Sequence, residues 1–160
     1  MVSKRAIVII NAVGKRGPFP DTLTKSLAGV PLLQRAINLA LEITVSSQIH
    51  VISDAEEIDL MSERNGVVSL KTKDLHDLFA SFHNENTIIS VSPYCPLLTK
   101  REVNNALRVF TDTKSNFLLP VKRNTKTALS FWEDKEIIQY LASAVDKETV
   151  LTICPDFHIF

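Results

Sequence analysis

The stretch "AIVIINAVGKRGPFPDTLTKSLAGVPLLQRAINLAL", residues 6–41, places a buried strand, a loop and an amphipathic helix in direct succession. Residues 6–10 are a continuous, mostly β-branched run, which is typical of a parallel strand covered on both faces. After the loop, apolar side chains recur at helical spacing: Leu32, Leu33, Ala36, Ile37, Ala40 and Leu41. A strand that leads through a loop into a helix predicts an α/β fold.

The same alternation continues along the chain. We expect further strands at residues 48–53, 67–70, 87–92, 116–121, 127–132, 149–154 and 157–160, and helices at 55–66, 74–84, 99–110 and 135–145. Thr99 and Glu102 have the spacing of a capping box before the third of these helices. The pattern predicts one domain over residues 1–160, a three-layer α/β/α fold with a mostly parallel sheet.

Composition limits the classes of partner. The chain has 160 residues, of which 45% are hydrophobic, and its 18 Lys and Arg balance 18 Asp and Glu. A net charge of zero argues against a nucleic acid partner, whose binding needs many cations. No apolar stretch approaches the roughly 20 residues of a membrane span. Two cysteines without metal-ligand neighbours and a start unlike a signal peptide favour the cytoplasm.

The loop after the first strand is both glycine-rich and basic. Gly14 and Gly17 allow the backbone to expose N–H groups, and Lys15 and Arg16 add positive charge beside them. The loop is neither a P-loop nor a dinucleotide fingerprint, so phosphate binding and a solvated basic turn both remain open. In parallel sheets ligands bind beyond the carboxyl ends of the strands, which here are followed by residues 11–20, 53–57 and 92–98.

Four motifs in order resemble the sugar-activating nucleotidyltransferases, especially the acylneuraminate (CMP-sialic acid) cytidylyltransferases. They are the opening strand and loop with "LAGVPL" (27–32), "ISDAEEI" (52–58), "SPYCPLLT" (92–99) and "NFLLPVKRN" (116–124). The resemblance covers about the first 125 residues. It implies a Rossmann-like nucleotide-diphospho-sugar transferase fold, shortened at the C-terminus and divergent at the site. Shortening should leave apolar surface uncovered, so a homodimer is a further expectation.

The resemblance also implies roles for individual residues, with CTP and a sugar acid as substrates and Mg²⁺ as cofactor. Lys15 and Arg16 would be catalytic, and Lys122 and Arg123 would contact the sugar. Asp54 would bind the metal, although it could equally cap the helix that follows it. The nucleotide would be held by Asn11, Ala12, Gly14, Lys15, Arg16, Gly17, Lys25 and Ser92.

The chain departs from the family pattern where the chemistry would occur. In a gapless alignment on Pro20, the family's loop arginine becomes Val13 and its last lysine becomes Thr22, with Lys25 as a substitute cation nearby. Ser92 stands where the family has glutamine. Two functions therefore remain open: a cytidylyltransferase that makes a CMP-sugar and pyrophosphate, and a catalytically inactive relative that serves in binding or assembly.

Overall fold

The computed structural model describes residues 6–13, 21–71, 87–113 and 118, together with the backbone of residues 121–124, 150–153 and 157–159. Within these residues the main sheet has the order β5-β4-β1-β6-β9. Its strands are β1 (Ala6–Ala12), β4 (Ile49–Ser53), β5 (Val68–Lys71), β6 (Thr87–Val91) and β9 (Phe157–Ile159). All neighbours are parallel except β9, which runs antiparallel to β6. The predicted α/β class with a mostly parallel sheet is confirmed.

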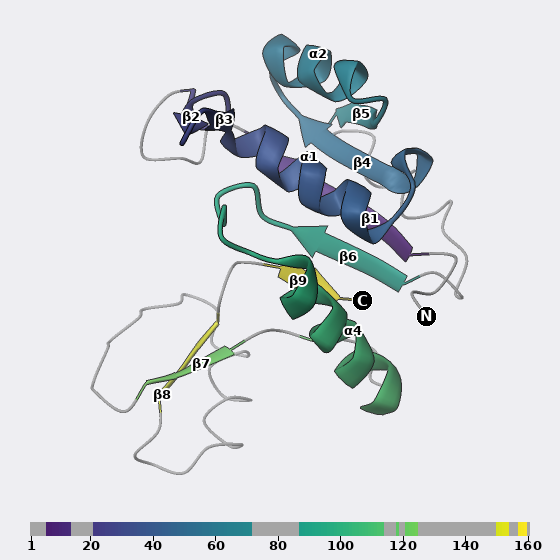
Figure 1. Cartoon of the computed structure of the whole chain (residues 1–160), viewed down its shortest axis with the longest axis vertical. Helices are drawn as coiled ribbons and strands as arrows, with labels where there is room; N and C mark the ends of the chain where they lie inside the picture. Colours follow the sequence, from purple (N-terminus) through teal and green to yellow (C-terminus); the bar gives the residue numbers. More distant parts are fainter. Residues whose placement is uncertain are drawn as a thin grey trace.

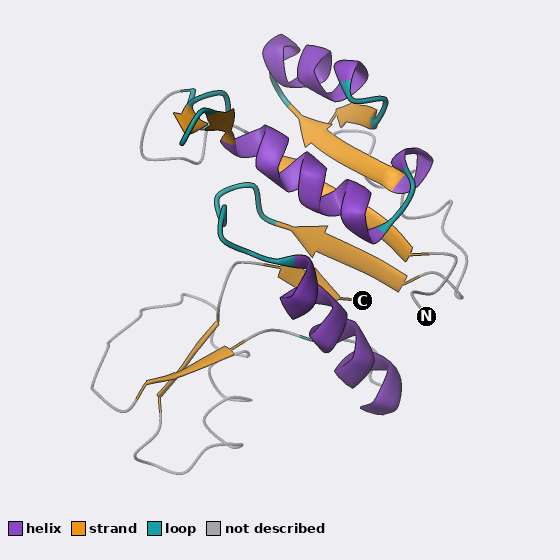
Figure 2. Cartoon of the chain, viewed as in Figure 1, coloured by secondary structure: helices purple, strands orange, loops and turns teal. Residues whose placement is uncertain are grey.

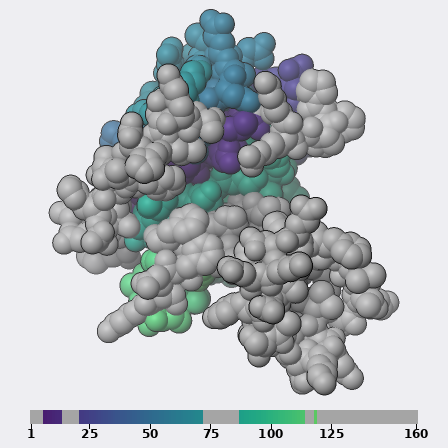
Figure 3. All heavy atoms as spheres, turned by 180° about the vertical axis from the view of Figure 1, so that it is seen from behind, coloured from purple at the N-terminus to yellow at the C-terminus, as the bar shows by residue number. Residues whose placement is uncertain are grey.

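Strand β1 is the centre of this sheet. It pairs with β4 on one side and with β6 on the other. Val8 and Ile10 are fully buried on one face, and Ile7 and Ile9 are each only 4% exposed on the other. From behind, Figure 3 shows the purple residues of β1 between the blue residues above and the teal residues below. Burial of both faces explains the unbroken apolar run.

Three helices cover one face of the sheet (Figures 1 and 2): α1 (Leu32–Ile43), α2 (Glu56–Arg64) and α4 (Lys100–Thr113). A short 3₁₀ turn, η2 (Ser46–Gln48), leads from α1 into β4. Leu33 and Ile37 of α1, Ile58 of α2 and Val103 of α4 belong to one apolar cluster with β1. The packed face of α1 thus carries Leu33, Ala36, Ile37 and Ala40 of the predicted pattern, whereas Leu41 is exposed.

The ends of these helices follow from local side-chain chemistry. The Thr99 backbone N–H donates to Glu102 Oε2 at 2.8 Å, and the Glu102 N–H donates to Thr99 Oγ1 at 3.4 Å. This is the predicted capping box. The hydrogen bonds from Thr99 lower the pKa of Glu102. Helix α2 ends before Gly66, which has a φ of +67° and supplies the left-handed conformation that stops the helix.

Residues 26–31 form a small hairpin that the sequence patterns did not predict. Strands β2 (Ser26–Leu27) and β3 (Val30–Pro31) pair antiparallel, with Ala28 at φ +52° and Gly29 at φ +80° between them. Two successive positive φ angles define a type I′ turn, in which glycine is favoured and alanine is strained. Two-residue strands carry too few side chains to show alternation.

Gly29→Ala should destabilise the protein by about 1 kcal/mol, the cost of a left-handed conformation for a residue with a Cβ. A Cβ at this position would meet nothing within 4 Å, so backbone strain alone is tested. Gly29→Asn should cost less, because asparagine tolerates this conformation. Urea denaturation measures both variants. Equal stability of Gly29→Ala and the unchanged protein would contradict the turn assignment.

The remaining sequence predictions vary in outcome. Of the strand predicted at residues 116–121, the structure describes Leu118 and Val121, and Val121 begins β7 (Val121–Asn124). Strand β7 pairs antiparallel with β8 (Val150–Ile153) in a separate two-stranded sheet. The helices predicted at 74–84 and 135–145 and the strand at 127–132 lie outside the described residues. Among the helices described, none is both long and apolar enough to cross a bilayer.

An ion pair ties α2 to the edge strand β5. Lys71 Nζ donates a hydrogen bond to Asp59 Oδ2, and Ser69 Oγ donates to Asp59 Oδ1. Partial burial acts to raise the pKa of Asp59, but the hydrogen bonds from Lys71, Ser69 and Ser53 and the charge of Lys71 outweigh it. The pKa of Asp59 is therefore lowered in the folded protein.

A lowered carboxyl pKa gives stability that is present above the unfolded-state pKa, near 4, and is lost as the pH falls through the folded-state value. Between about pH 5 and pH 3, the free energy of unfolding should thus fall more steeply for the unchanged protein than for Asp59→Asn. Urea midpoints across this range measure the difference. Parallel pH profiles would show that the ion pair contributes nothing.

Candidate active site at the carboxyl edge of the sheet

The carboxyl ends of three adjacent strands meet at one edge of the sheet. Ala12, the last residue of β1, is in register with Ser53, the last residue of β4. Val91, the last residue of β6, is in register with Ile10 on the other side of β1. The loops that follow β1, β4 and β6 therefore leave from neighbouring positions, as predicted for a ligand site.

Asp54 follows β4 directly and its side chain is exposed. The N-cap of α2 is Ala55, and no side chain caps this helix. Ser53 Oγ accepts a hydrogen bond from the Ala55 N–H at 3.1 Å and donates to the Ala55 carbonyl at 2.8 Å. The alternative that Asp54 serves as the N-cap is therefore wrong, because the helix begins one residue later and the serine orders the turn.

Tyr94 brings an aromatic hydroxyl to the loop after β6, and the sequence patterns did not single it out. Its side chain packs against the main apolar cluster. Its hydroxyl oxygen is buried, and within the described part of the chain it has no hydrogen-bond partner. Burial, and after it the charge of Asp54, raises the pKa of Tyr94. The loops after β4 and β6 thus place a carboxylate within electrostatic reach of a phenol.

Ser92 and Cys95 lie in the same loop. Ser92 Oγ accepts a hydrogen bond from the Tyr94 N–H at 3.3 Å, and the Ser92 carbonyl accepts one from the Cys95 N–H at 3.3 Å. Both residues are half-buried beside a hollow of only about 10 Å³, too small for a ligand. Ser92 shapes this loop through its hydroxyl, and its nucleotide contact stays a prediction.

The side chains at the end of the central strand lie in three different environments. Strand β1 ends with Asn11 and Ala12, and Val13 follows it. Asn11 is exposed, whereas Ala12 is fully buried in the main apolar cluster. The Ala12 side chain therefore packs in the core, and only its backbone could face a nucleotide. Val13 is half-buried and packs against the second apolar cluster, which contains Ile7, Ile9 and Ile52.

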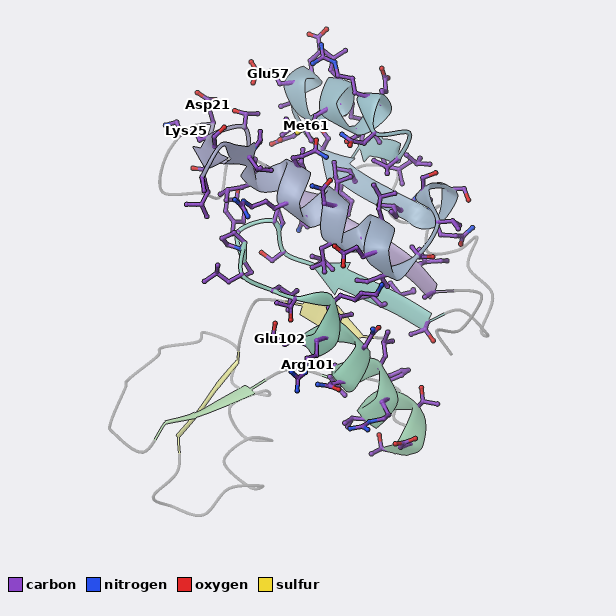
Figure 4. All side chains as sticks on the ribbon, in the orientation of Figure 1. Asp21, Lys25, Glu57, Met61, Arg101 and Glu102 are labelled. Carbon is purple, nitrogen blue, oxygen red and sulfur yellow. The ribbon has the colours of Figure 1, made fainter. Side chains whose placement is uncertain are left out.

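Lys25 lies in an exposed turn beside the start of α1, where Figure 4 labels it together with Asp21. Asp21 has a φ of +61°, and its carbonyl accepts hydrogen bonds from the Thr24 and Lys25 N–H groups at 3.1 and 3.2 Å. The Lys25 carbonyl in turn accepts from the Leu32 N–H at 3.2 Å. This bonding fixes the backbone of Lys25 and leaves its ammonium group at the surface.

Several predicted site residues are not tested by the structure. Gly14, Lys15, Arg16 and Gly17 lie outside the described residues. Lys122 and Arg123 are described as backbone only, in β7, opposite Thr152 and Leu151 of β8. Within the described part of the chain, no three His, Cys, Asp or Glu side chains come together to hold a metal ion. Asn11, Ser92 and Asp54 all lie at the ends of the adjacent strands β1, β4 and β6.

Comparison with known proteins shows similarity at the level of structure. No family model matches the sequence, and no curated protein matches it. CMP:2-keto-3-deoxy-manno-octonic acid synthetase, solved in complex with CTP, matches with a TM-score of 0.63 and 14% identity over 96% of this chain and 73% of its own. A cytidylyltransferase from Leptospira borgpetersenii serovar Hardjo-bovis (strain JB197) matches with a TM-score of 0.56 and 19% identity.

The second match covers 73% of this chain, which spans only about half, 54%, of the Leptospira protein. Identities of 14% and 19% support a statement about architecture rather than about individual residues. The chain therefore has the α/β fold found in that CTP-bound synthetase and in that cytidylyltransferase.

Proposed function

We propose that this chain binds CTP at the carboxyl edge of β1, β4 and β6 and transfers its cytidylyl group to a sugar acid. The observation that carries the proposal is the match, over 96% of the chain, to a synthetase solved with CTP. The meeting of three strand ends around β1 supports the same location. Residues 14–17 follow β1 in the sequence and include the glycines and cations that a triphosphate would require.

In the proposed reaction, a hydroxyl oxygen of the sugar acid attacks the α-phosphorus of CTP. The new P–O bond gives the CMP-sugar, the bond to the β-phosphate breaks, pyrophosphate leaves with the electron pair, and the proton of the hydroxyl passes to solvent. Negative charge grows on the phosphate oxygens along this path. Lys15, Arg16 and the amides beside Gly14 and Gly17 would stabilise that charge, while Lys122 and Arg123 would attract the carboxylate of the sugar acid.

Asp54 is the residue that fits a Mg²⁺ role. Mg²⁺ binds through one or two carboxylates, keeps several waters and takes its other ligands from substrate phosphates. Asp54 is exposed at the end of β4 and offers one carboxylate to such an ion. The positive charge of the metal ion would stabilise the negative charge on the leaving pyrophosphate. Asp54 would hold it at the strand end next to β1.

Asp54→Asn should lower pyrophosphate release from CTP about 100-fold or more in the presence of an accepted sugar acid, since a neutral amide is a poor Mg²⁺ ligand. Asp112→Asn is the control, because Asp112 is an exposed carboxylate near the end of α4. The assay compares pyrophosphate release with and without each of several sugar acids. Equal rates for Asp54→Asn and Asp112→Asn would exclude the metal role of Asp54.

A second possible function is that of a binding protein with the same fold but without catalysis. The apolar environment of Val13 supports this alternative. At the position where the resemblance expects an arginine, an apolar side chain packs against Ile7, Ile9 and Ile52. Such packing leaves no charge there for a phosphate. Saturable CTP binding without pyrophosphate release for any sugar acid would support this second function. Turnover that depends on a sugar acid would exclude it.

A further inference from the structure

A groove of about 460 Å³ lies between α1 and the start of α4, and Pro96 and Leu98 of the loop after β6 form part of its lining. Its walls include Arg35 and Asn38 of α1, Thr99 before α4, and Lys100 and Arg101 in the first turn of α4. Figure 4 labels Arg101 there beside Glu102. The volume is within the range of small-molecule sites. The proposed CTP site does not use this groove.

The charge of the groove is unbalanced. Three of its side chains are cationic, Arg35, Lys100 and Arg101, and Glu42 is the acidic one among the described lining residues. Within the described residues, the salt bridge is that between Lys71 and Asp59. The three cations of the groove therefore have no carboxylate partner among these residues. Like charges that share a cavity repel one another, and an anion bound between them would remove that repulsion.

Arg35 gives this charge a fixed position. One terminal nitrogen of its guanidinium donates to the Leu27 carbonyl at 2.5 Å, which ties the side chain to the hairpin. Its Nε is buried and has no hydrogen-bond partner among the described residues. A buried N–H without an acceptor carries a free-energy penalty. A guanidinium held at one end by the hairpin keeps its positive charge beside the groove, where the charge attracts a planar or tetrahedral oxyanion.

Two backbone amides at the start of α4 are already engaged in hydrogen bonds. The capping box already occupies the Thr99 and Glu102 N–H groups. The rest of the groove is mixed, with the amide of Asn38, the carboxylate of Glu42 and apolar walls from Leu39 and Leu98. The amide donates and accepts hydrogen bonds and the carboxylate accepts them, as the hydroxyls of a sugar or polyol require.

We infer that this groove is a second ligand site, which binds the phosphate of a phosphate monoester between Arg35, Lys100 and Arg101 and its hydroxylated body towards Asn38 and Glu42. The inference is independent of the proposed cytidylyl transfer. It requires only the geometry of α1, the hairpin and α4.

The test is an NMR titration of the full chain with glucose 6-phosphate at constant ionic strength, with glucose as the uncharged comparison. The phosphate ester should shift the Arg35 Nε–H signal and the Lys100 and Arg101 backbone amides in a saturable manner, and glucose should not. Lys100→Ala/Arg101→Ala should weaken binding about tenfold or more. Arg108→Ala, an exposed arginine further along α4, should leave binding unchanged.

Three results would overturn the inference. One is an unchanged Arg35 Nε–H signal at millimolar glucose 6-phosphate. Another is an equal loss of binding in Arg108→Ala, which would indicate non-specific attraction to a positive surface. The third is a set of shifts confined to residues 11–13 and 53–54, which would place the phosphate at the carboxyl edge instead. None of these results bears on CTP turnover, so failure here is distinct from failure of the proposed function.

Discussion

Lys15→Ala/Arg16→Ala should weaken CTP binding about 10²–10⁴-fold. Each cation is expected to make one charge-assisted hydrogen bond to the triphosphate, and such bonds contribute about 1.5–3 kcal/mol each. Loss of both therefore removes about 3–6 kcal/mol, which converts to this range at about 1.4 kcal/mol per tenfold. The two residues are adjacent in the segment that follows β1 in the sequence, and β1 is the middle one of the three adjacent strands β4, β1 and β6. Calorimetric titration with CTP and Mg²⁺ measures the loss.

The chain contains a matched control. Lys100 and Arg101 are another adjacent Lys-Arg pair, exposed in the first turn of α4 and lining the separate groove. Lys100→Ala/Arg101→Ala removes the same two charges from the molecule. If the loop at residues 14–17 binds the triphosphate, CTP affinity should survive this change. Equal losses in the two double variants would mean that net charge, rather than the loop, governs binding.

Leu33→Ala should lower the free energy of unfolding by about 2–5 kcal/mol. Leu33 is fully buried in the main apolar cluster, where α1 packs on β1. Removing a buried leucine side chain costs its transfer free energy and, in addition, leaves a cavity that its neighbours fill only in part. A loss of this size is a large share of the stability of an ordinary domain. Urea denaturation with a shared m-value measures it.

Leu41→Ala, on the same helix, is the control for helix propensity. Leu41 is 40% exposed, so its truncation should cost less than about 1 kcal/mol. Both substitutions exchange leucine for alanine in α1 and differ chiefly in burial. A Leu33→Ala effect no larger than that of Leu41→Ala would contradict the packing of α1 against the sheet.

The sequence is sufficient to predict the central strand β1, the helix α1 that packs on it and the start of α4. A β-branched run predicts β1, because a strand buried on both faces tolerates only apolar side chains. Apolar residues at helical spacing predict α1, and the Thr99–Glu102 pair predicts the start of α4. These signals are local, and each depends on one periodicity or on one pair of interacting side chains. The structure confirms all three elements.

Other features depend on contacts that no local pattern encodes. The hairpin at residues 26–31 is too short for alternation, and its turn contains alanine at a positive φ, where glycine or asparagine would have been a signal. The order of the strands, with β9 antiparallel to β6, depends on the end of the chain returning to the sheet. Tyr94 was missed because an isolated tyrosine in a loop resembles any packed aromatic residue.

The candidate site was predictable in location but not in detail. Strand ends identify the edge, since parallel strands place their carboxyl ends together. They do not show which side chains face outwards. Ala12 turns into the core and Val13 joins the second apolar cluster, although both adjoin the exposed Asn11. Asp54 could be separated from its capping role only when the structure showed Ala55 at the N-cap of α2.

The most direct test is a titration of the unchanged protein with CTP and Mg²⁺, observed by NMR at the ends of the central strands. The account predicts saturable shifts of the backbone amides of Asn11, Val13, Asp54 and Tyr94, with Arg108 unaffected. No shift at these four amides with millimolar CTP, or shifts only elsewhere on the chain, would contradict it.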